Sequence, residues 1–164
     1  MIGVLPLALS ILIGFFQVAE TGTVIGLVKL PSGKTSENAR VLLLPPKYTE
    51  AWNKEVQTRL DNYWEIYKPE LLANKDRVPK LYRLAYVEAL RNLITTMRRD
   101  MGEGASKYIK ESGPSGQFEF RGIPFGTYQL LVQAMIEGDD LTWSKIVDVQ
   151  TSVPMFVDLG KPAS

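Results

Sequence analysis

The chain has no cysteine and no histidine among its 164 residues. Without cysteine it can form no disulfide framework, no thiolate nucleophile and no thiolate metal site. Without histidine it lacks the usual general base near neutral pH, the imidazole metal ligand and the middle member of most nucleophilic triads. These two absences exclude most familiar catalytic and metal-binding chemistry. We therefore expect a protein that is not an enzyme, with no catalytic residue, no metal site and no cofactor.

An excess of charge of one sign is also absent. The chain carries 19 Lys and Arg against 18 Asp and Glu, which leaves a formal net charge of +1. Proteins that bind nucleic acid usually concentrate cations that track the phosphate backbone. The balance therefore predicts no nucleic-acid partner.

No charged side chain occurs before Glu20. The preceding residues are almost wholly apolar, as in an export segment. Their length is close to the ~20 residues that cross a bilayer as a helix. We expect residues 1–19 to be a signal peptide or an N-terminal anchor, and the sequence leaves open whether the segment is cleaved. The chain is then periplasmic, in the cell envelope or extracellular, and touches a membrane only if residues 2–19 are retained.

An alternation of apolar and polar residues with a period of two marks two stretches, residues 23–44 and 116–159. The clearest example is Gln117-Phe118-Glu119-Phe120-Arg121, followed by turn residues from Gly122 to Gly126. Strands are expected at residues 23–30, 39–44, 117–121, 127–134, 142–149 and 153–159. Because helices and strands do not alternate along the chain, the pattern predicts an antiparallel Greek-key β-sandwich.

Between the two stretches the apolar residues recur every three to four positions, which is typical of helices. The first helix should end at or near Pro69, and the second should begin near Pro79 and stop at Gly102 or Gly104. Two amphipathic helices with a short connector most simply pack antiparallel. We expect a helical hairpin inserted at residues 48–112 into a single domain of residues 20–164.

The strand segments contain a set of recurring motifs. They are Gly26-x-Val28, Ala39-x-Val41-x-Leu43, Gly116-x-Phe118-x-Phe120-x-Gly122-Ile123-Pro124-x-Gly126-x-Tyr128-x-Leu130, Val147-x-Val149 and Val157-x-Leu159. On these residues the chain resembles the carboxypeptidase regulatory-like (transthyretin-like, prealbumin-like) β-sandwich domains over about half of its length. Members of that family have a short connection and one more small strand where this chain has the helical insert, so a typical count of seven strands is not expected here.

The resemblance implies an accessory or adhesive module of exported proteins that binds or spaces and has no chemistry of its own. The broader kinship includes carbohydrate-binding-like sandwiches and transthyretin carriers. Two catalytic relatives, the hydroxyisourate hydrolases and the intradiol dioxygenases, rely on histidines, which this chain does not have.

Aromatic residues of the insert are the most informative candidates for a binding site. Such a stripe usually forms a seam between helices and their contact with the body of the protein. Trp64 and Ile66 lie off the main stripe, however, so a second, partly apolar face is available to a partner protein or a second copy. The alternative is a carbohydrate or small ligand that stacks on exposed rings, with Tyr128 among the candidates. The predicted contact residues are Trp52, Trp64, Tyr67, Tyr82, Tyr86 and Trp143.

Other constellations of residues are better explained without a site. Isopeptide-forming sandwiches of the Cna B type need a buried Lys and carboxyl groups, but strand parity turns Lys29, Glu119 and Asp158 towards solvent. The acidic residues Glu137, Asp139 and Asp140 lack the spacing of a calcium loop and are expected to form a solvated hairpin tip. The same holds for Asp100 and Glu103, which we take as solvated charges at a helix end. A glycosidase-like carboxylate pair has no supporting motif.

Overall fold

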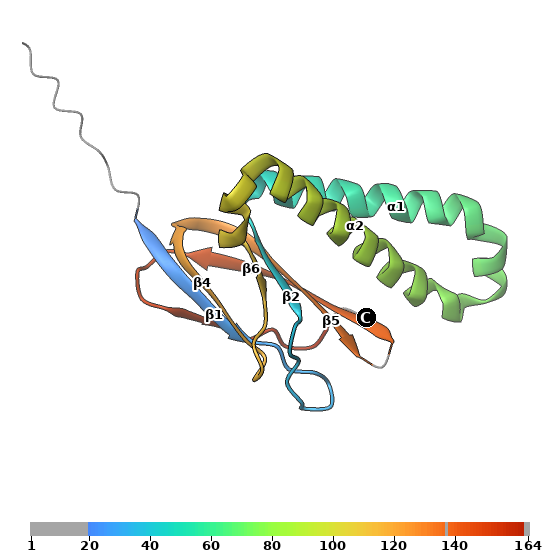
Figure 1. Ribbon diagram of the computed structural model, residues 1–164. Helices are drawn as coiled ribbons and strands as arrows, with labels where there is room; N and C mark the ends of the chain where they lie inside the picture. The colour runs from blue at the N-terminus through green and yellow to red at the C-terminus, as the bar shows by residue number, and fades with distance from the viewer. Residues whose placement is uncertain (1–19, 137, 163–164) are drawn as a thin grey trace, which may run out of the picture.

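The computed structural model describes residues 20–136 and 138–162, which form two sheets and a helical layer (Figure 1). The predicted export segment, residues 1–19, lies outside the described residues. In chain order the elements are β1 (Thr21–Leu27), β2 (Arg40–Leu44), α1 (Pro46–Ala73), η1 (Lys75–Arg77), α2 (Val78–Met101), η2 (Gly102–Lys107), β3 (Ile109–Glu111), β4 (Gln117–Pro124), β5 (Gly126–Ile136), β6 (Asp139–Val149) and β7 (Met155–Val157). The helices thus interrupt the strands between β2 and β3.

The strands form two sheets that face each other. One sheet has the order β4-β1-β7, in which β1 is antiparallel to β4 and parallel to β7. The other has the order β3-β2-β5-β6 and is antiparallel between all neighbours. The predicted β-sandwich with a helical insert is confirmed.

Side chains at alternate strand positions fill the space between the sheets. Phe118 and Phe120 of β4 are buried, and Glu119 between them is exposed, as the alternation predicts. The ring of Phe118 packs directly over Gly26 of β1. A Cβ at Gly26 would lie 2.3 Å from Cζ of Phe118. Only glycine leaves room for this ring in a closely packed interior.

Strand β2 is buried on both faces, which explains why its leucines do not alternate with polar residues. Val41 and Leu43 point into the core between the sheets. Leu42 and Leu44 point the other way and pack against the helical layer, together with Leu131 of β5. A strand with both faces covered reads as a continuous apolar run. The hairpin is therefore a third layer on the outer face of the four-stranded sheet.

Helix α1 continues past Pro69 to Ala73, so the prediction that it ends at or near this proline is wrong. A proline inside a helix removes one backbone hydrogen bond and crowds the preceding turn. The extra turn carries Leu71, which is only 4% exposed. Burial of this leucine favours continuation of the helix.

The helical insert ends earlier than residue 112, because residues Ile109–Glu111 form strand β3. This strand pairs antiparallel with β2, with Arg40 opposite Glu111 and Leu42 opposite Ile109. The described residues thus contain seven strands, and the expectation of fewer is wrong. The chain leaves the sheet after β2 and returns beside the same strand.

Hydrogen bonds of Ser112 hold the chain where it returns to the sheet. Its hydroxyl donates to the carbonyl oxygen of Ser36 at 2.6 Å and accepts the backbone N–H of Ala39 at 2.9 Å. Its own backbone N–H donates to the carbonyl of Ala39, and its carbonyl accepts the N–H of Asn38, each at 2.9 Å. Ser112 is only 2% exposed, so these bonds are shielded from water.

Candidate functional site

The structure places half of the predicted contact residues in or against its cores. Trp52 is 4% exposed and packs edge-to-face on Tyr86, with ring centroids 5.4 Å apart. Trp143 is 2% exposed, and its indole Nε1 donates to the carbonyl of Gly160 at 3.3 Å. Tyr128 is also buried, and its hydroxyl donates to the carbonyl of Pro124 at 2.8 Å. These rings stabilise the fold and offer no open face for stacking.

The other three predicted residues are exposed at the far end of the hairpin. Trp64 and Tyr67 of α1 are each 41% exposed, and Tyr82 of α2 is 47% exposed. Three aliphatic side chains of the same segment are exposed by 45% or more. These residues occupy more than one side of the hairpin end, and together we call them the distal surface: Trp64, Ile66, Tyr67, Leu72, Tyr82 and Leu84. It contains six of the ten large hydrophobic side chains that are exposed among the described residues.

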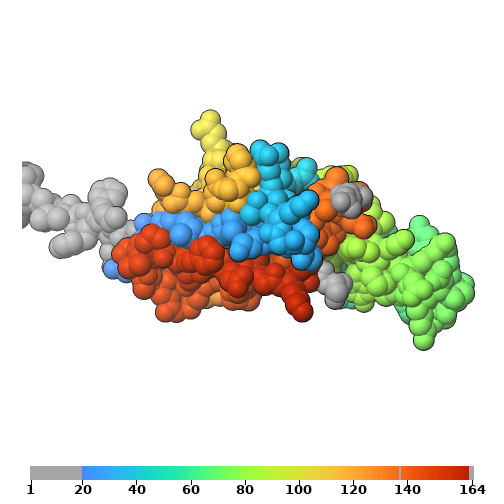
Figure 2. All heavy atoms as spheres, turned by 90° about the horizontal axis from the view of Figure 1, so that it is seen from below, coloured from blue at the N-terminus to red at the C-terminus, as the bar shows by residue number. Residues whose placement is uncertain are grey.

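The distal surface lies on a part of the hairpin that extends beyond the sandwich. Figure 2 shows the green end of the hairpin, around the α1–α2 connection, projecting past the strands. Near the base of the hairpin, the apolar stripes of both helices are covered by the sheet. At the far end the helices have only each other to pack against. Sequence reasoning identified Trp64 and Ile66 as off the main stripe but missed Leu72, which lies on the same helix face as Trp64, two turns further along.

Two hollows flank the line where the far ends of the helices meet. One has a volume of about 270 Å³ and is lined by Trp64, Tyr63 and Tyr82 among others. The second, of about 340 Å³, is lined by Tyr67 and Leu84, with Arg77 and Lys80 at its polar side. Leu71 and Leu81 line both hollows. An apolar floor with a few polar groups at its rim suits a protein side chain or a sugar ring.

A network of polar side chains joins the two helices midway along the hairpin. The guanidinium of Arg59 pairs with Glu55 at 2.8 Å and with Glu88 of α2. The hydroxyl of Tyr63 donates to the same Glu88 carboxylate at 2.5 Å. Burial raises the pKa of Tyr63, and the Glu88 charge raises it further. Although burial alone would lower the pKa of Arg59, Glu55 and Glu88 hold it above its ordinary value. Both helices are thus locked in one register.

The charged groups at the base of the hairpin form structural ion pairs. Asp100 binds Lys47 at 3.5 Å and Arg99 at 3.3 Å, and it accepts the hydroxyl of Tyr48 at 3.5 Å. Although desolvation alone would raise the pKa of Asp100, Arg99 and Lys47 bring it below its usual value. A carboxylate held ionised in this way is a poor general acid.

The residues considered for an isopeptide bond are all exposed. Lys29 and Asp158 line a shared hollow of about 200 Å³, yet both remain open to solvent. Glu119 pairs with Arg121 at 2.7 Å, and the hydrogen bond from Arg121 lowers the pKa of the Glu119 carboxyl. The bond would require a buried neutral amine and protonated carboxyls, whereas all three side chains are exposed and Glu119 is paired with Arg121.

The acidic residues Asp139 and Asp140 are the first two residues of β6 and form no metal site in the described part of the chain. Asp139 is exposed, and Asp140 accepts a hydrogen bond from Nε2 of Gln133 at 2.8 Å. Glu137 lies outside the described residues. Within residues 20–136 and 138–162, no group of three or more carboxylates could enclose a metal ion. In the same ranges, no helix combines the length and apolar character needed to span a membrane.

Comparison with known proteins finds only distant structural similarity. No protein family model and no curated protein matches the chain. A Pseudomonas aeruginosa protein, provisionally described as carbohydrate-binding, has 17% identity and a TM-score of 0.37 over 86% of this chain and 88% of its own. The major pilin subunit BcpA of Bacillus cereus has 10% identity and a TM-score of 0.41 over 88% of this chain and 30% of its own.

The pilus backbone protein RrgB of Streptococcus pneumoniae has 17% identity and a TM-score of 0.35, over 79% of this chain and 34% of its own. The chain thus spans about a third of either pilin. At these identities and TM-scores the likeness says nothing about what this chain binds.

Proposed function

We propose that the chain is an exported, non-enzymatic interaction module in which the sandwich is a scaffold and the hairpin presents the recognition surface. The observation that carries this proposal is the exposure of six large apolar side chains on the distal surface. Soluble proteins seldom concentrate exposed apolar side chains of this size at one end of the molecule unless that end binds something. Tyrosine and tryptophan are also the residues most enriched at the centres of protein interfaces.

The chemistry of the chain supports the same function. It has no histidine or cysteine to act as base, nucleophile or soft metal ligand. The carboxylates with a lowered pKa, Asp100 and Glu119, are paired with arginine or lysine. The helices are held in register by the Arg59, Tyr63 and Glu88 contacts, so the distal surface is presented with its backbone already ordered. A preordered surface loses less entropy on binding.

Site-specific photo-crosslinking tests the proposal. A photoreactive amino acid at Ile66, on the distal surface, should give a discrete crosslinked product in intact cells that produce the chain. The matched control is Val153 on the sandwich, because the two side chains have nearly equal exposure, 66% and 68%. Sedimentation equilibrium of the purified chain then shows whether the captured partner is a second copy. Equal crosslinking at both positions, or none at Ile66, would refute the assignment.

A carbohydrate ligand is the second candidate, favoured by the half-exposed ring of Trp64 beside Tyr82 in one hollow. Of the three tryptophans, Trp52 and Trp143 are buried and Trp64 is exposed to a ligand in solution. A change in tryptophan emission on adding a glycan therefore reports on Trp64. Saturable changes across a glycan panel that vanish in Trp64→Phe would favour carbohydrate over protein. An unchanged emission with every glycan would remove this candidate.

A further inference from the structure

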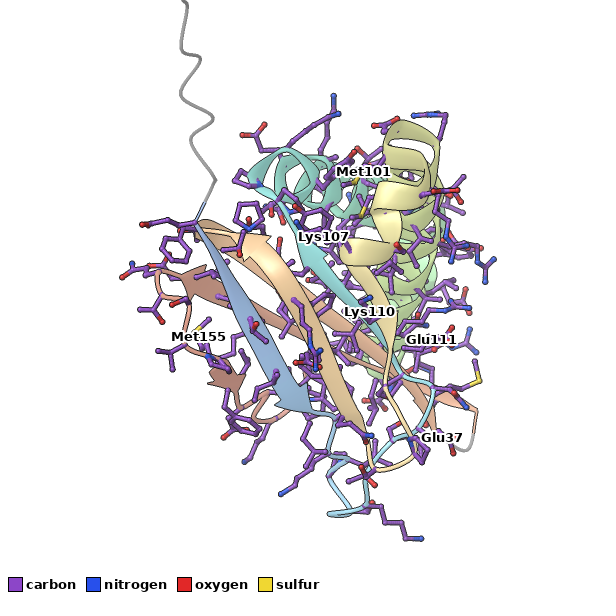
Figure 3. All side chains as sticks on the ribbon, turned by 60° about the vertical axis from the view of Figure 1, so that its left-hand side comes forward. Glu37, Met101, Lys107, Lys110, Glu111 and Met155 are labelled. Atoms are coloured by element: carbon purple, nitrogen blue, oxygen red, sulfur yellow. The ribbon has the colours of Figure 1, made fainter. Side chains whose placement is uncertain are left out.

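A cleft lined by cations lies between helix α2 and strand β3, nearer the base of the hairpin than the distal surface. Its volume is about 460 Å³. Arg91 and Arg98 line it from α2, Arg40 from β2 and Lys110 from β3, and Glu111 of β3 is the single carboxylate among these lining residues. Ile94 and Ile109 supply an apolar floor. Figure 3 shows Lys110 and Glu111 on the strand beside the helical layer.

These four cations have no anionic partner among the described residues. The ion pairs there use Lys47, Arg59, Arg77, Arg99 and Arg121 instead. Even Arg40, which lies opposite Glu111 in the strand register, has no carboxylate within 4 Å. Cations gathered in a cleft with low-dielectric walls create a focused positive potential. The chain is nearly neutral overall, so this potential is a local property.

The spacing of the cations favours a ligand with several separate anionic groups. Arg91 and Arg98 are seven residues apart on one helix face, which separates them by about 10 Å along the helix axis. Arg40 and Lys110 come from two different strands across the cleft. Guanidinium groups bind carboxylates in a bidentate geometry. A single small anion would contact only part of this set, whereas an extended chain of carboxylates can reach all of it.

The cleft continues into an apolar hollow along the edge of the sandwich. This second hollow has a volume of about 540 Å³ and shares Lys110 and Glu111 with the basic cleft. Ile25, Leu27 and Phe156 contribute its apolar surface. Gln117, Glu111 and Glu119 also line it, and Glu119 is neutralised by its pair with Arg121. Phe156, the middle residue of β7, is 64% exposed. The combined groove therefore offers cations at one end and apolar side chains at the other.

We propose that this groove binds an extended acidic peptide segment of a partner protein. Carboxylates of the peptide would lie on Arg40, Arg91, Arg98 and Lys110, and an apolar side chain of the same peptide would lie beside Phe156. The apolar half is the feature that favours a peptide over a sulfated glycan, because a glycan offers no aliphatic or aromatic side chain. The groove and the distal surface are separate sets of residues, so each can fail without the other.

Fluorescence anisotropy tests the proposal on the full chain in a non-ionic detergent. The probe is a labelled peptide with three glutamates on each side of one phenylalanine, and the comparison peptide has serine in the centre. We expect saturable binding that weakens as salt rises. Replacing the central phenylalanine with serine should lower the affinity by roughly tenfold, because it removes one buried aromatic side chain.

Charge reversal locates the binding. Arg91→Glu with Arg98→Glu should reduce peptide affinity by at least about tenfold, because two charge-assisted contacts are lost and replaced by repulsion. The matched control is Lys54→Glu with Lys68→Glu, which changes the net charge equally on exposed positions of α1. Equal losses in both variants would mean general charge attraction and overturn the proposal. Absence of binding at low salt, or tighter binding of a heparin oligosaccharide than of the peptide, would also overturn it.

Discussion

Replacement of Ser112 by alanine is expected to destabilise the whole fold, because this side chain closes the point where the chain returns from the helical insert. The hydroxyl accepts the N–H of Ala39 at 2.9 Å and donates to the carbonyl of Ser36 at 2.6 Å. Ser112 is 2% exposed, Ala39 2% and Ser36 8%. Alanine would leave the N–H of Ala39 and the carbonyl of Ser36 without this buried partner.

The cost follows from the two groups that lose their partner. A buried polar group left without a hydrogen bond costs about 1–3 kcal/mol. The N–H of Ala39 makes the larger contribution, because a carbonyl oxygen with two lone pairs tolerates partial satisfaction better than an N–H does. We expect the free energy of unfolding to fall by about 2–3 kcal/mol. For a chain of this length that corresponds to a decrease in melting temperature of roughly 4–12 °C.

Urea unfolding followed by far-ultraviolet circular dichroism measures this cost. The slope of the free energy of unfolding against urea should stay unchanged, because the surface exposed on unfolding is the same. The control is Ser32→Ala in the exposed turn after β1, which should stay within about 0.5 kcal/mol of the wild type. If Ser112→Ala also unfolds within that range, the two hydrogen bonds do not hold the insert in place and the reasoning fails.

Three further changes test other contacts. Gly26→Ala should lower the free energy of unfolding by about 1–3 kcal/mol in urea titrations, since the added Cβ meets the Phe118 ring. Adding Phe118→Leu to this variant should recover part of the loss. Trp52→Ala should cost about 3–5 kcal/mol, whereas Trp64→Ala should stay within about 0.5 kcal/mol; similar costs would contradict the assigned burial. Burial raises the pKa of Tyr108 above its ordinary value of 10.0, so the contribution of this residue to stability should be constant below that pH and be lost as the pH rises above it. Tyr108→Phe should make the fall between pH 9 and pH 11 shallower, and an unchanged profile would refute this.

The fold could be predicted because apolar residues recur every second position in the strand segments and every three to four positions in the insert. Alternation places Phe118 and Phe120 on one face of a strand, and their burial follows from that face alone. Strand β3 could not be predicted, because three residues are too few to show a period. Its partner β2 lies before the insert, so only the tertiary pairing defines it. The continuation of α1 past Pro69 has the same origin, since burial of Leu71 against the second helix overrides a local signal.

The candidate sites were less predictable than the fold. A helical stripe indicates which face is apolar, but not how far the sheet beneath it extends. Trp52 and Trp64 were therefore both predicted as contact residues, although only Trp64 lies off the main stripe; Trp52 is 4% and Trp64 41% exposed. The basic cleft gave no signal at all. Arg40 and Lys110 come from strands before and after the insert, and only the pairing of β2 with β3 brings them near α2.

The hairpin combines two roles that are separated along its length. Near its base, Trp52, Val56 and Met97 are buried against the sheet and anchor both helices. Isolated helices are marginally stable in water, so the far end keeps its structure because the base is packed and the Arg59–Glu88 contact joins the helices. The exposed side chains of the distal surface contribute little to that stability. Substitutions there can therefore remove recognition while folding is unchanged, whereas substitutions at the base cannot separate the two.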